Sequence, residues 1–191
     1  MDRYRTPGQR VLDKVIHRID EHCAAFIRLA PFATLATASA DGWPDVSPRG
    51  GDPGFVRVLD HNRLAMPDRQ GNNRVDSLRN LAGNPRAALM FFVPGIDETL
   101  RVGGRGKLSA DPDLLASMEE FGKPPRALLS IAVHEAYFHC GKALMRSKLW
   151  SPEAHVERAA LPSISVVIHD QTSLGEPESQ AAVEARYKEQ L

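Results

Sequence analysis

Seven short runs of β-type residues, each bounded by turn-forming residues, constrain the fold of this chain more than any other feature. Apolar, β-branched and aromatic residues dominate the runs, and Asp41-Gly42 between two of them is a typical hairpin signal. Few helical segments separate the runs, which favours an antiparallel barrel over a parallel α/β sheet. We therefore predict a mainly β fold with flanking helices. The runs are 32–38, 43–47, 54–59, 63–66, 86–93, 99–108 and 128–139.

Helical spacing of apolar residues marks four segments outside these runs. The first is long enough for a single amphipathic helix that packs on a larger body, and Pro31 ends it. Asp111-Pro112 starts the third, because proline is favoured in the first turn of a helix. The sequence GGRG at 103–106 interrupts the sixth β-type run and suits a bulge or a close backbone approach. The helical segments are 10–30, 73–82, the residues that follow 112, and 140–150.

The length of 191 residues predicts one domain with appendages and a substantial core. We expect residues 1–30 to form a helical segment that packs on the barrel, 31–151 to form the barrel, and 152–191 to form a C-terminal extension. Two interpretations stay open for each half of this extension. Residues 163–169 predict an edge strand or a subunit contact, and 175–191 predict a terminal helix or a disordered tail.

Charge and cysteine content exclude several classes of protein. The chain has 24 Lys and Arg against 24 Asp and Glu, without a block of like charges, which argues against nucleic acid or an anionic membrane as the main partner. We find no apolar run long enough to cross a bilayer, and the first ten residues are charged instead of signal-like. Two cysteines, Cys23 and Cys140, make no disulfide framework. We expect a cytoplasmic protein.

The segment 66–78, MPDRQGNNRVDSL, is the strongest candidate for a binding site. It follows a strand-like run and opens a predicted helix, and a helix N-terminus presents free N–H groups and a partial positive charge. Arg69 and Arg74 add guanidinium donors that match phosphate oxygens, with Asn72 and Asn73 between them. One interpretation is a phosphate site. The other is a polar loop in which Asn73 caps the helix, with an acidic residue three positions on that imitates a capping box.

Two further pairs of residues carry suitable donors. Ser47 and Arg49 lie in the predicted loop 47–51, SPRGG, which either presents donors to an anion or is an ordinary surface turn. Thr99 and Arg101 lie on one face of a predicted strand, because side chains alternate with a period of two, so both can point at one ligand. The alternative for this pair is a solvated strand face.

The last candidates lie in the predicted helix that ends at Trp150. Lys142 and Arg146 fall near one side of it, which is either part of a site or a solvated basic face. Cys140 lies near the start of this helix, where thiol pKa values are lowered, but no Cys/His/Asn set accompanies it. The chain has no HExxH motif and no paired CxxC spacing. We therefore predict no metal site and assign no catalytic residue.

Taken together, these residues resemble the pyridoxamine 5'-phosphate oxidase-like family of FMN-binding split barrels, and in particular a bacterial subgroup of FMN-dependent oxidoreductases. The resemblance covers residues 26–151. It is carried by DGWPDVSPRGGDPGFVRVLD at 41–60, LAMPDRQGNNRVDSLRNLAGNPR at 64–86 and FHCGKALMRSKLW at 138–150. It implies a six-stranded antiparallel split barrel that forms a homodimer, with FMN in a groove between the two subunits.

The resemblance also implies cofactor-binding residues. Positions near the flavin ring or its ribityl chain are Ser47, Arg49, Pro67, Asp68, Thr99 and Arg101. The positions that hold the phosphate are Arg69, Asn73 and Arg74, with Asn72 in the same loop. Positions that contribute from the partner subunit or from the substrate side are Lys142, Arg146 and Trp150.

The activity implied by the resemblance is an FMN-dependent hydride transfer between the flavin and an unidentified small molecule. The loop RQGNNR at 69–74 replaces the Arg-Lys pair of pyridoxamine phosphate oxidases, and residues 151–191 lack their substrate-phosphate arginine segment, which argues against vitamin B6 as the substrate. Two alternatives stay open: a flavin-binding carrier or sensor without turnover, and a deazaflavin or haem in the same groove.

Overall fold

The computed structural model describes residues 6–120 and 122–190. The chain forms two compact units, residues 1–150 and 151–191. The first unit contains one antiparallel sheet with the strand order β2-β1-β5-β6-β7-β4-β3. Its strands are β1 (Phe32–Ala38), β2 (Pro44–Gly50), β3 (Arg57–Asp60), β4 (Arg63–Asp68), β5 (Arg86–Val93), β6 (Ile96–Ser109) and β7 (Ala127–His139).

Each of the seven predicted runs forms a strand, and the mainly β fold is confirmed. The expected six-stranded barrel is wrong in strand number and in closure, because the described residues form a seven-stranded sheet in which β2 and β3 are edges. β2 also extends through residues 47–50, which were expected to form a loop. Pro48 is tolerated there because an edge strand can leave a backbone position without an N–H donor.

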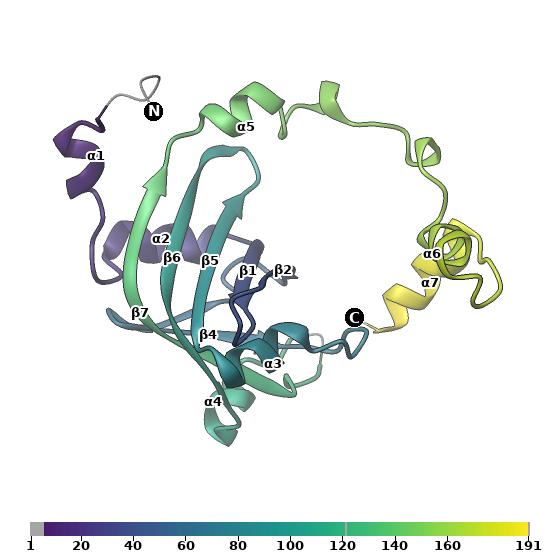
Figure 1. The fold of residues 1–191 in the computed structure, drawn as a ribbon, viewed down its shortest axis with the longest axis horizontal. Helices are drawn as coiled ribbons and strands as arrows, with labels where there is room; N and C mark the ends of the chain where they lie inside the picture. Colours follow the sequence, from purple (N-terminus) through teal and green to yellow (C-terminus); the bar gives the residue numbers. More distant parts are fainter. Residues whose placement is uncertain (1–5, 121, 191) are drawn as a thin grey trace. The chain divides into compact units, whose positions relative to one another are not determined.

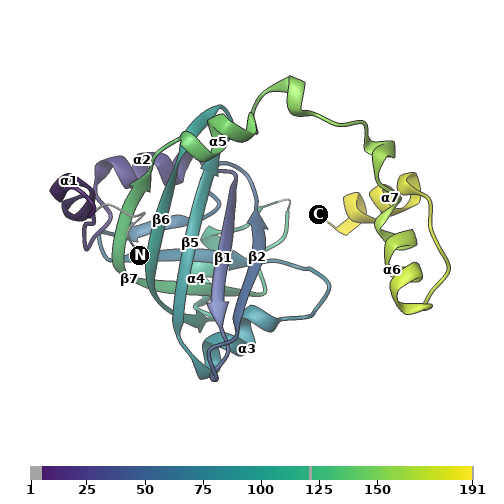
Figure 2. The same ribbon diagram turned by 45° about the horizontal axis from the view of Figure 1, so that its top comes forward.

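A bulge between Gly103 and Gly104 bends the two long central strands. β5 pairs with β6 through the bulge as far as Arg105, whereas β4 pairs only with residues 127–132 of β7, which lie beyond the bulge. Gly104 is required here, since a Cβ at this position would lie 2.1 Å from the carbonyl oxygen of Ala132. The sheet therefore curves strongly, and β4 crosses at a steep angle to β1 and β5 (Figures 1 and 2). The glycine motif at 103–106 predicted this bulge correctly.

The core fills the concave side of the bent sheet. Alternation along β1 buries Ala33, Leu35 and Thr37, and alternation along β5 buries every second residue up to Val93. Helix α2 (Glu21–Leu29) adds its apolar face to the same core. Complete burial of a large aliphatic or aromatic side chain contributes about 1.5–3 kcal/mol, so this single cluster dominates the stability of the unit.

The N-terminal segment is not one helix, and the prediction of a single helix over 10–30 is wrong. It forms α1 (Gln9–Asp13) and α2, separated by an extended stretch. In this stretch Ile16 makes a backbone bridge to Ala136 of β7, which adds a short segment to the sheet edge. α2 then begins anew because the side chain of Asp20 accepts a hydrogen bond from the Cys23 amide at 2.8 Å.

Three short helices complete the first unit: α3 (Asp76–Gly83), α4 (Pro112–Ser117) and α5 (Lys142–Ser147). α4 begins as predicted, with Asp111 as its N-cap. The second unit contains two 3₁₀ turns (Pro152–Ala154 and Arg158–Ala160), α6 (Ile164–Thr172) and α7 (Gln180–Gln190). Of the two interpretations of 163–169, the edge strand is therefore wrong, and the subunit contact stays a prediction. Among the described residues, no helix is both long and apolar enough to span a membrane.

Candidate cofactor-binding site

The connection between β4 and α3 has an unusual backbone. Two residues that are not glycine adopt left-handed conformations, Asn73 at φ 60° and Val75 at φ 50°. Such a conformation costs roughly 1–3 kcal/mol, and for a β-branched valine it is a clear outlier. α3 begins at Asp76, later than predicted, and its N-cap residue Val75 makes no side-chain hydrogen bond to the first turn. Strain of this kind is concentrated at functional sites.

The capping interpretation of this loop is wrong. The side chain of Asn73 accepts a hydrogen bond from the Arg126 guanidinium at 2.9 Å instead of capping α3. Asp76 accepts from Nε of Arg74 at 2.7 Å and lies 3.9 Å from Nη1 of Arg79. The hydrogen bond from Arg74 to Asp76 raises the pKa of Arg74 above its ordinary value. The first turn of α3 thus keeps uncapped amides beside an exposed guanidinium, which is a suitable environment for an anion.

A continuous series of hydrogen bonds joins this start of α3 to β1, β2 and β4. The carboxylate of Asp45 accepts from the hydroxyl of Ser77, which is 3% exposed. The guanidinium of Arg49 donates to Ser47 and lies 3.4 Å from the carboxylate of Asp68. In order along the series, the members are Asn80, Thr37, Asp45, Ser77, Ser47, Arg49 and Asp68, at donor–acceptor distances of 3.0, 3.3, 2.9, 3.1, 3.2 and 3.4 Å.

This network fixes the side chains that β2 presents to the concave face. Asp45, Ser47 and Arg49 alternate along the strand and are all half-buried, opposite the buried residues of β1. Because two nitrogens of the Arg49 guanidinium are held, by Ser47 and Asp68, its positive charge has a defined position. The structure thus brings Ser47, Arg49 and Asp68 together, with Pro67 buried beside Asp68 on β4.

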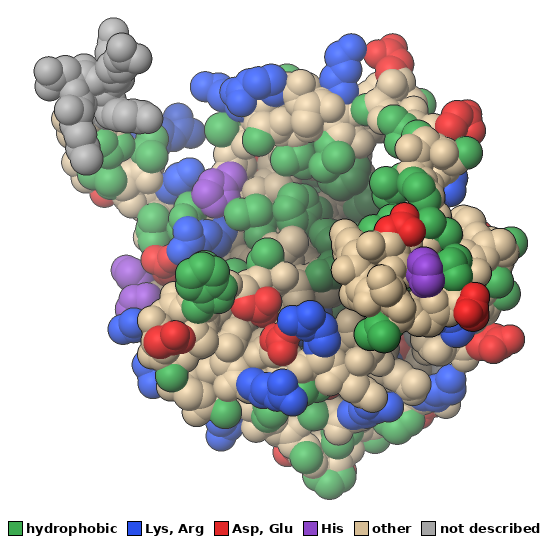
Figure 3. Space-filling view, turned by 45° about the vertical axis from the view of Figure 1, so that its right-hand side comes forward, with side chains coloured by type: hydrophobic (Ala, Val, Ile, Leu, Met, Phe, Trp, Pro, Cys, Tyr) green, Lys and Arg blue, Asp and Glu red, His purple; other side chains and the backbone are tan. Residues whose placement is uncertain are grey.

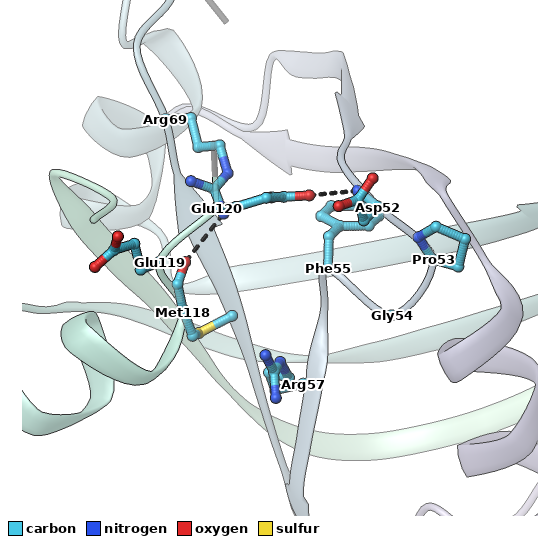
Figure 4. Close-up of a pocket in the computed structure, with 9 residues that line it drawn as sticks. All are labelled: Asp52, Pro53, Gly54, Phe55, Arg57, Arg69, Met118, Glu119 and Glu120. Carbon is cyan, nitrogen blue, oxygen red and sulfur yellow. Dashed lines mark hydrogen bonds and ion pairs between the residues drawn. The ribbon is translucent and has the colours of Figure 1, made fainter. Parts of the chain in front are cut away.

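Arg69 lines a neighbouring pocket of about 140 Å³, and Arg74 is not among the residues that line it (Figure 4). Its Nη2 lies 2.5 Å from the carboxylate of Glu120 and donates to the carbonyl of Met118 at 3.0 Å. Glu120 also accepts a hydrogen bond from the backbone amide of Asp52. The remaining lining residues are Pro53, Gly54, Phe55, Arg57 and Glu119. In this conformation the guanidinium of Arg69 is therefore bound to Glu120 and to the Met118 carbonyl.

A second group of the predicted residues lies on the convex face of the sheet. Thr99 is buried on β6, and Arg101 donates to Glu135 of β7 at 3.2 Å. The guanidinium of Arg101 also lies 5.5 Å from the ring centre of Tyr137, which in turn lies 4.9 Å from the ring of His139. Burial, followed by the positive charges of Lys14 and Arg101, lowers the pKa of His139 below its ordinary value.

The predicted residues of α5 belong to this second group. α5 packs against β6, and the indole N–H of Trp150 donates to the carbonyl of Ile96 at 2.9 Å. Lys142 and Arg146 are exposed on α5. Among the described residues, no hydrogen bond or ion pair joins this second group to the first, which contains Ser47, Arg49 and the β4–α3 loop with Asn72 exposed within it.

Several residues of the first group had not been predicted from the sequence. Ser77 and Asp45 have no special motif, although the position of Ser77 in the first turn of a helix is a usable signal. Glu120 and Arg126 come from the connection between α4 and β7, far away in the chain, and nothing in the local sequence signals their contacts. Acidic and basic side chains are interspersed on the face drawn in Figure 3, in agreement with the balanced charge. Within 6–120 and 122–190, no group of three or more His, Cys, Asp or Glu side chains is placed to hold a metal.

Comparison with known protein families identifies the family of this chain by sequence. The sequence model of one protein family, described as Pyridoxamine 5'-phosphate oxidase, matches residues 19–140, which is more than half of the chain. This stretch contains the whole sheet and both groups of candidate residues except those of α5. No curated protein matches the chain.

Solved structures share the fold. A single-residue variant of HupZ from Group A Streptococcus has a TM-score of 0.51 at 17% identity, over 63% of this chain and 99% of that chain. HupZ itself has a TM-score of 0.50 at 16% identity, over 62% and 91%. The Mycobacterium tuberculosis protein Rv2991 has a TM-score of 0.47 at 16% identity, over 78% and 97%. At these identities, the two HupZ structures indicate a shared fold alone.

Proposed function

Because this chain belongs to the pyridoxamine 5'-phosphate oxidase family, we propose that it binds FMN and acts as an FMN-dependent oxidoreductase on a small molecule. The observation that carries this proposal is the uncapped first turn of α3, preceded by a strained loop and accompanied by Arg74. A helix start with free amides and a guanidinium is suited to a phosphate group. The 5'-phosphate of FMN supplies that group.

The donor set fits such a phosphate. The first-turn amides of α3 and the Arg74 side chain would hold it, with Asn72 and Asn73 in the loop that frames it. Arg74 is exposed and bonded to Asp76, so it can share its remaining N–H donors with a phosphate oxygen. Asp76 and Asp45 place negative charge nearby, which makes the cationic residues of the loop important for binding.

The flavin itself supplies the redox chemistry, and the side chains around it bind and orient it. In this proposal Arg49, fixed between Ser47 and Asp68, stabilises negative charge on the reduced flavin. Pro67 and Asp68 contribute the β4 backbone. The convex-face residues Thr99, Arg101, Lys142, Arg146 and Trp150 act on the cofactor or substrate of the partner subunit.

We also propose that the protein is a homodimer with FMN at the interface. The separation of the two groups of residues supports this, since a second copy can supply the half of the site that one chain does not assemble. Two apolar side chains on the convex face are exposed, Phe32 of β1 at 40% and Val46 of β2 at 66%, and Trp43 in the hairpin between these strands is 77% exposed. Exposed apolar surface of this kind is typical of protein–protein contacts.

The test of the phosphate site compares two arginines that share one carboxylate. Arg74 and Arg79 are both exposed and both approach Asp76, but only Arg74 precedes the helix start. FMN and riboflavin are titrated into wild type, Arg74→Gln and Arg79→Gln, and binding is followed by quenching of flavin fluorescence. We expect Arg74→Gln to weaken FMN binding by about tenfold or more and to leave riboflavin unchanged. Equal FMN affinity in Arg74→Gln and wild type would remove this residue from the site.

Absorption spectra separate the proposed activity from its alternatives. A flavin spectrum that bleaches with NADH or NADPH and recovers in air supports an oxidoreductase. A bound flavin that no donor reduces supports a carrier or sensor. An absence of flavin binding, with spectra changed by a deazaflavin or by haem, would replace FMN by that cofactor.

A further inference from the structure

Arg69, the first residue of the proposed phosphate loop, is held by an acidic side chain of another segment. Its Nη2 lies 2.5 Å from Oε2 of Glu120, and the side chains are only 23% and 11% exposed. Figure 4 shows the Glu120 side chain between Arg69 and Asp52, with Met118 on the other side of the Arg69 guanidinium. A charge-assisted contact that is shielded from water in this way is stronger than one at the surface.

The contact with Glu120 does not provide acceptors for all the N–H donors of Arg69. Its Nε is buried and has no hydrogen-bond partner in the described part of the chain. A guanidinium has five N–H donors, and a buried donor without an acceptor is destabilising. The conformation bound to Glu120 is therefore not the best arrangement for this side chain, and another anion that accepts more of its donors can compete with Glu120.

Glu120 is anchored independently of Arg69. Its other carboxylate oxygen accepts the backbone amide of Asp52, and its backbone pairs with Lys123. The carboxylate thus occupies a position between a guanidinium and a backbone N–H, which is the combination of donors that binds phosphate oxygens. The loop that begins at Arg69 contains Asn73 and Val75 in left-handed conformations, and a loop conformation without them would release this strain.

We propose that Glu120 is an internal competitor for Arg69, which sets the affinity of the protein for a phosphate group. This inference rests on the proposed FMN site and extends it. In the structure Arg69 is bound to Glu120, and on phosphate binding it exchanges this carboxylate for the phosphate oxygens. The apparent affinity for the phosphate is then reduced by the fraction of molecules in which Glu120 holds Arg69. Glu120 acts through Arg69 and is a positioning residue, because it does not touch the cofactor.

The test is the variant Glu120→Gln, which removes the charge and keeps an oxygen for the Asp52 amide. Its matched control is Glu119→Gln, the neighbouring exposed carboxylate that lines the same pocket. FMN, riboflavin and inorganic phosphate are titrated into each protein by calorimetry. We expect Glu120→Gln to bind FMN and phosphate about tenfold more tightly, with riboflavin unchanged and Glu119→Gln equal to wild type. In an Arg69→Gln background, Glu120→Gln should have no effect.

The outcomes separate this inference from the proposed function. Weaker or unchanged FMN binding in Glu120→Gln, or an equal gain for riboflavin, would overturn the competition. If neither flavin binds any of the proteins, the proposed function fails. In that case the phosphate titration alone tests the competition between Glu120 and phosphate. An unchanged phosphate affinity in Glu120→Gln would then overturn the inference as well. Thermal melts of each variant show whether the fold is retained.

Discussion

The bulge at Gly104 allows a quantitative test of what shapes the sheet. A Cβ added there would lie 2.1 Å from the Ala132 carbonyl oxygen and 3.0 Å from its carbon, whereas real Cβ atoms almost never approach within 3.0 Å. The obstacle is backbone, so alanine requires the β6 and β7 strands to move apart by about 1 Å. Loss of two ladder hydrogen bonds at about 1 kcal/mol each, with added strain, predicts a cost of about 3 kcal/mol for Gly104→Ala.

The neighbouring glycine provides the control. A Cβ at Gly103 would meet the side chain of Glu135 at 3.1 Å, and this flexible chain can move aside, so Gly103→Ala should cost under about 1 kcal/mol. Urea unfolding followed by circular dichroism measures both. We also expect the melting temperature of Gly104→Ala to fall by about 6–12 °C. If the two alanine variants lose equal stability, the close backbone approach at Gly104 does not determine the bend.

Two further predictions concern the convex face. Burial, followed by the positive charges of Lys14 and Arg101, lowers the pKa of His139 in the folded state. The unfolded chain therefore takes up the proton first as the pH falls below about 6.5. The stability that neutral His139 contributes is therefore lost at acidic pH. Between pH 7.5 and 5.5, the free energy of unfolding measured with urea should fall less in His139→Gln than in wild type. An equal fall in both proteins would contradict this prediction. For the proposed dimer, we expect Val46→Asp to halve the mass measured by light scattering. Leu108, which is 46% exposed near the end of β6, provides the control, because Leu108→Asp should leave the mass unchanged. A wild-type protein that binds flavin as a monomer would contradict the dimer.

Strand positions could be predicted where burial alternates along a single segment. β1 and β5 match the predicted runs at both ends, because each alternates between core and surface with a period of two. β2 was predicted too short, since Pro48 was interpreted as part of a turn, and only the position of β2 at the sheet edge makes it acceptable. The break between α1 and α2 depends on the bridge from Ile16 to Ala136, a contact between distant segments that apolar spacing cannot reveal.

The candidate site could likewise be predicted only where it depends on neighbouring residues in the sequence. The loop that begins at Arg69 and ends at α3 could be identified from local composition, because its donors lie next to one another in the sequence. The direction of the Arg69 side chain could not, since it depends on Glu120, 51 residues later in the chain. α6 shows the same limit, because the β-branched run after Ser163 predicts a strand, whereas the hydrogen bond from the Val166 amide to the Ser163 hydroxyl starts a helix.

The contacts made by Glu120 and Arg126 follow from the register of two strands. Asp68, the last residue of β4, is paired with Ala127, the first residue of β7, so the two chains leave the sheet at the same place. The Arg126 amide donates to the Asp68 carbonyl, and the α4–β7 connection therefore runs beside the loop that starts at Arg69. The Gly103–Gly104 bulge faces β7 immediately beyond Ala132, which is the last residue of β7 that pairs with β4. The pairing of β4 with β7 thus places Glu120 beside Arg69 and ends where the bulge begins, so we expect Gly104→Ala to alter FMN affinity as well as stability.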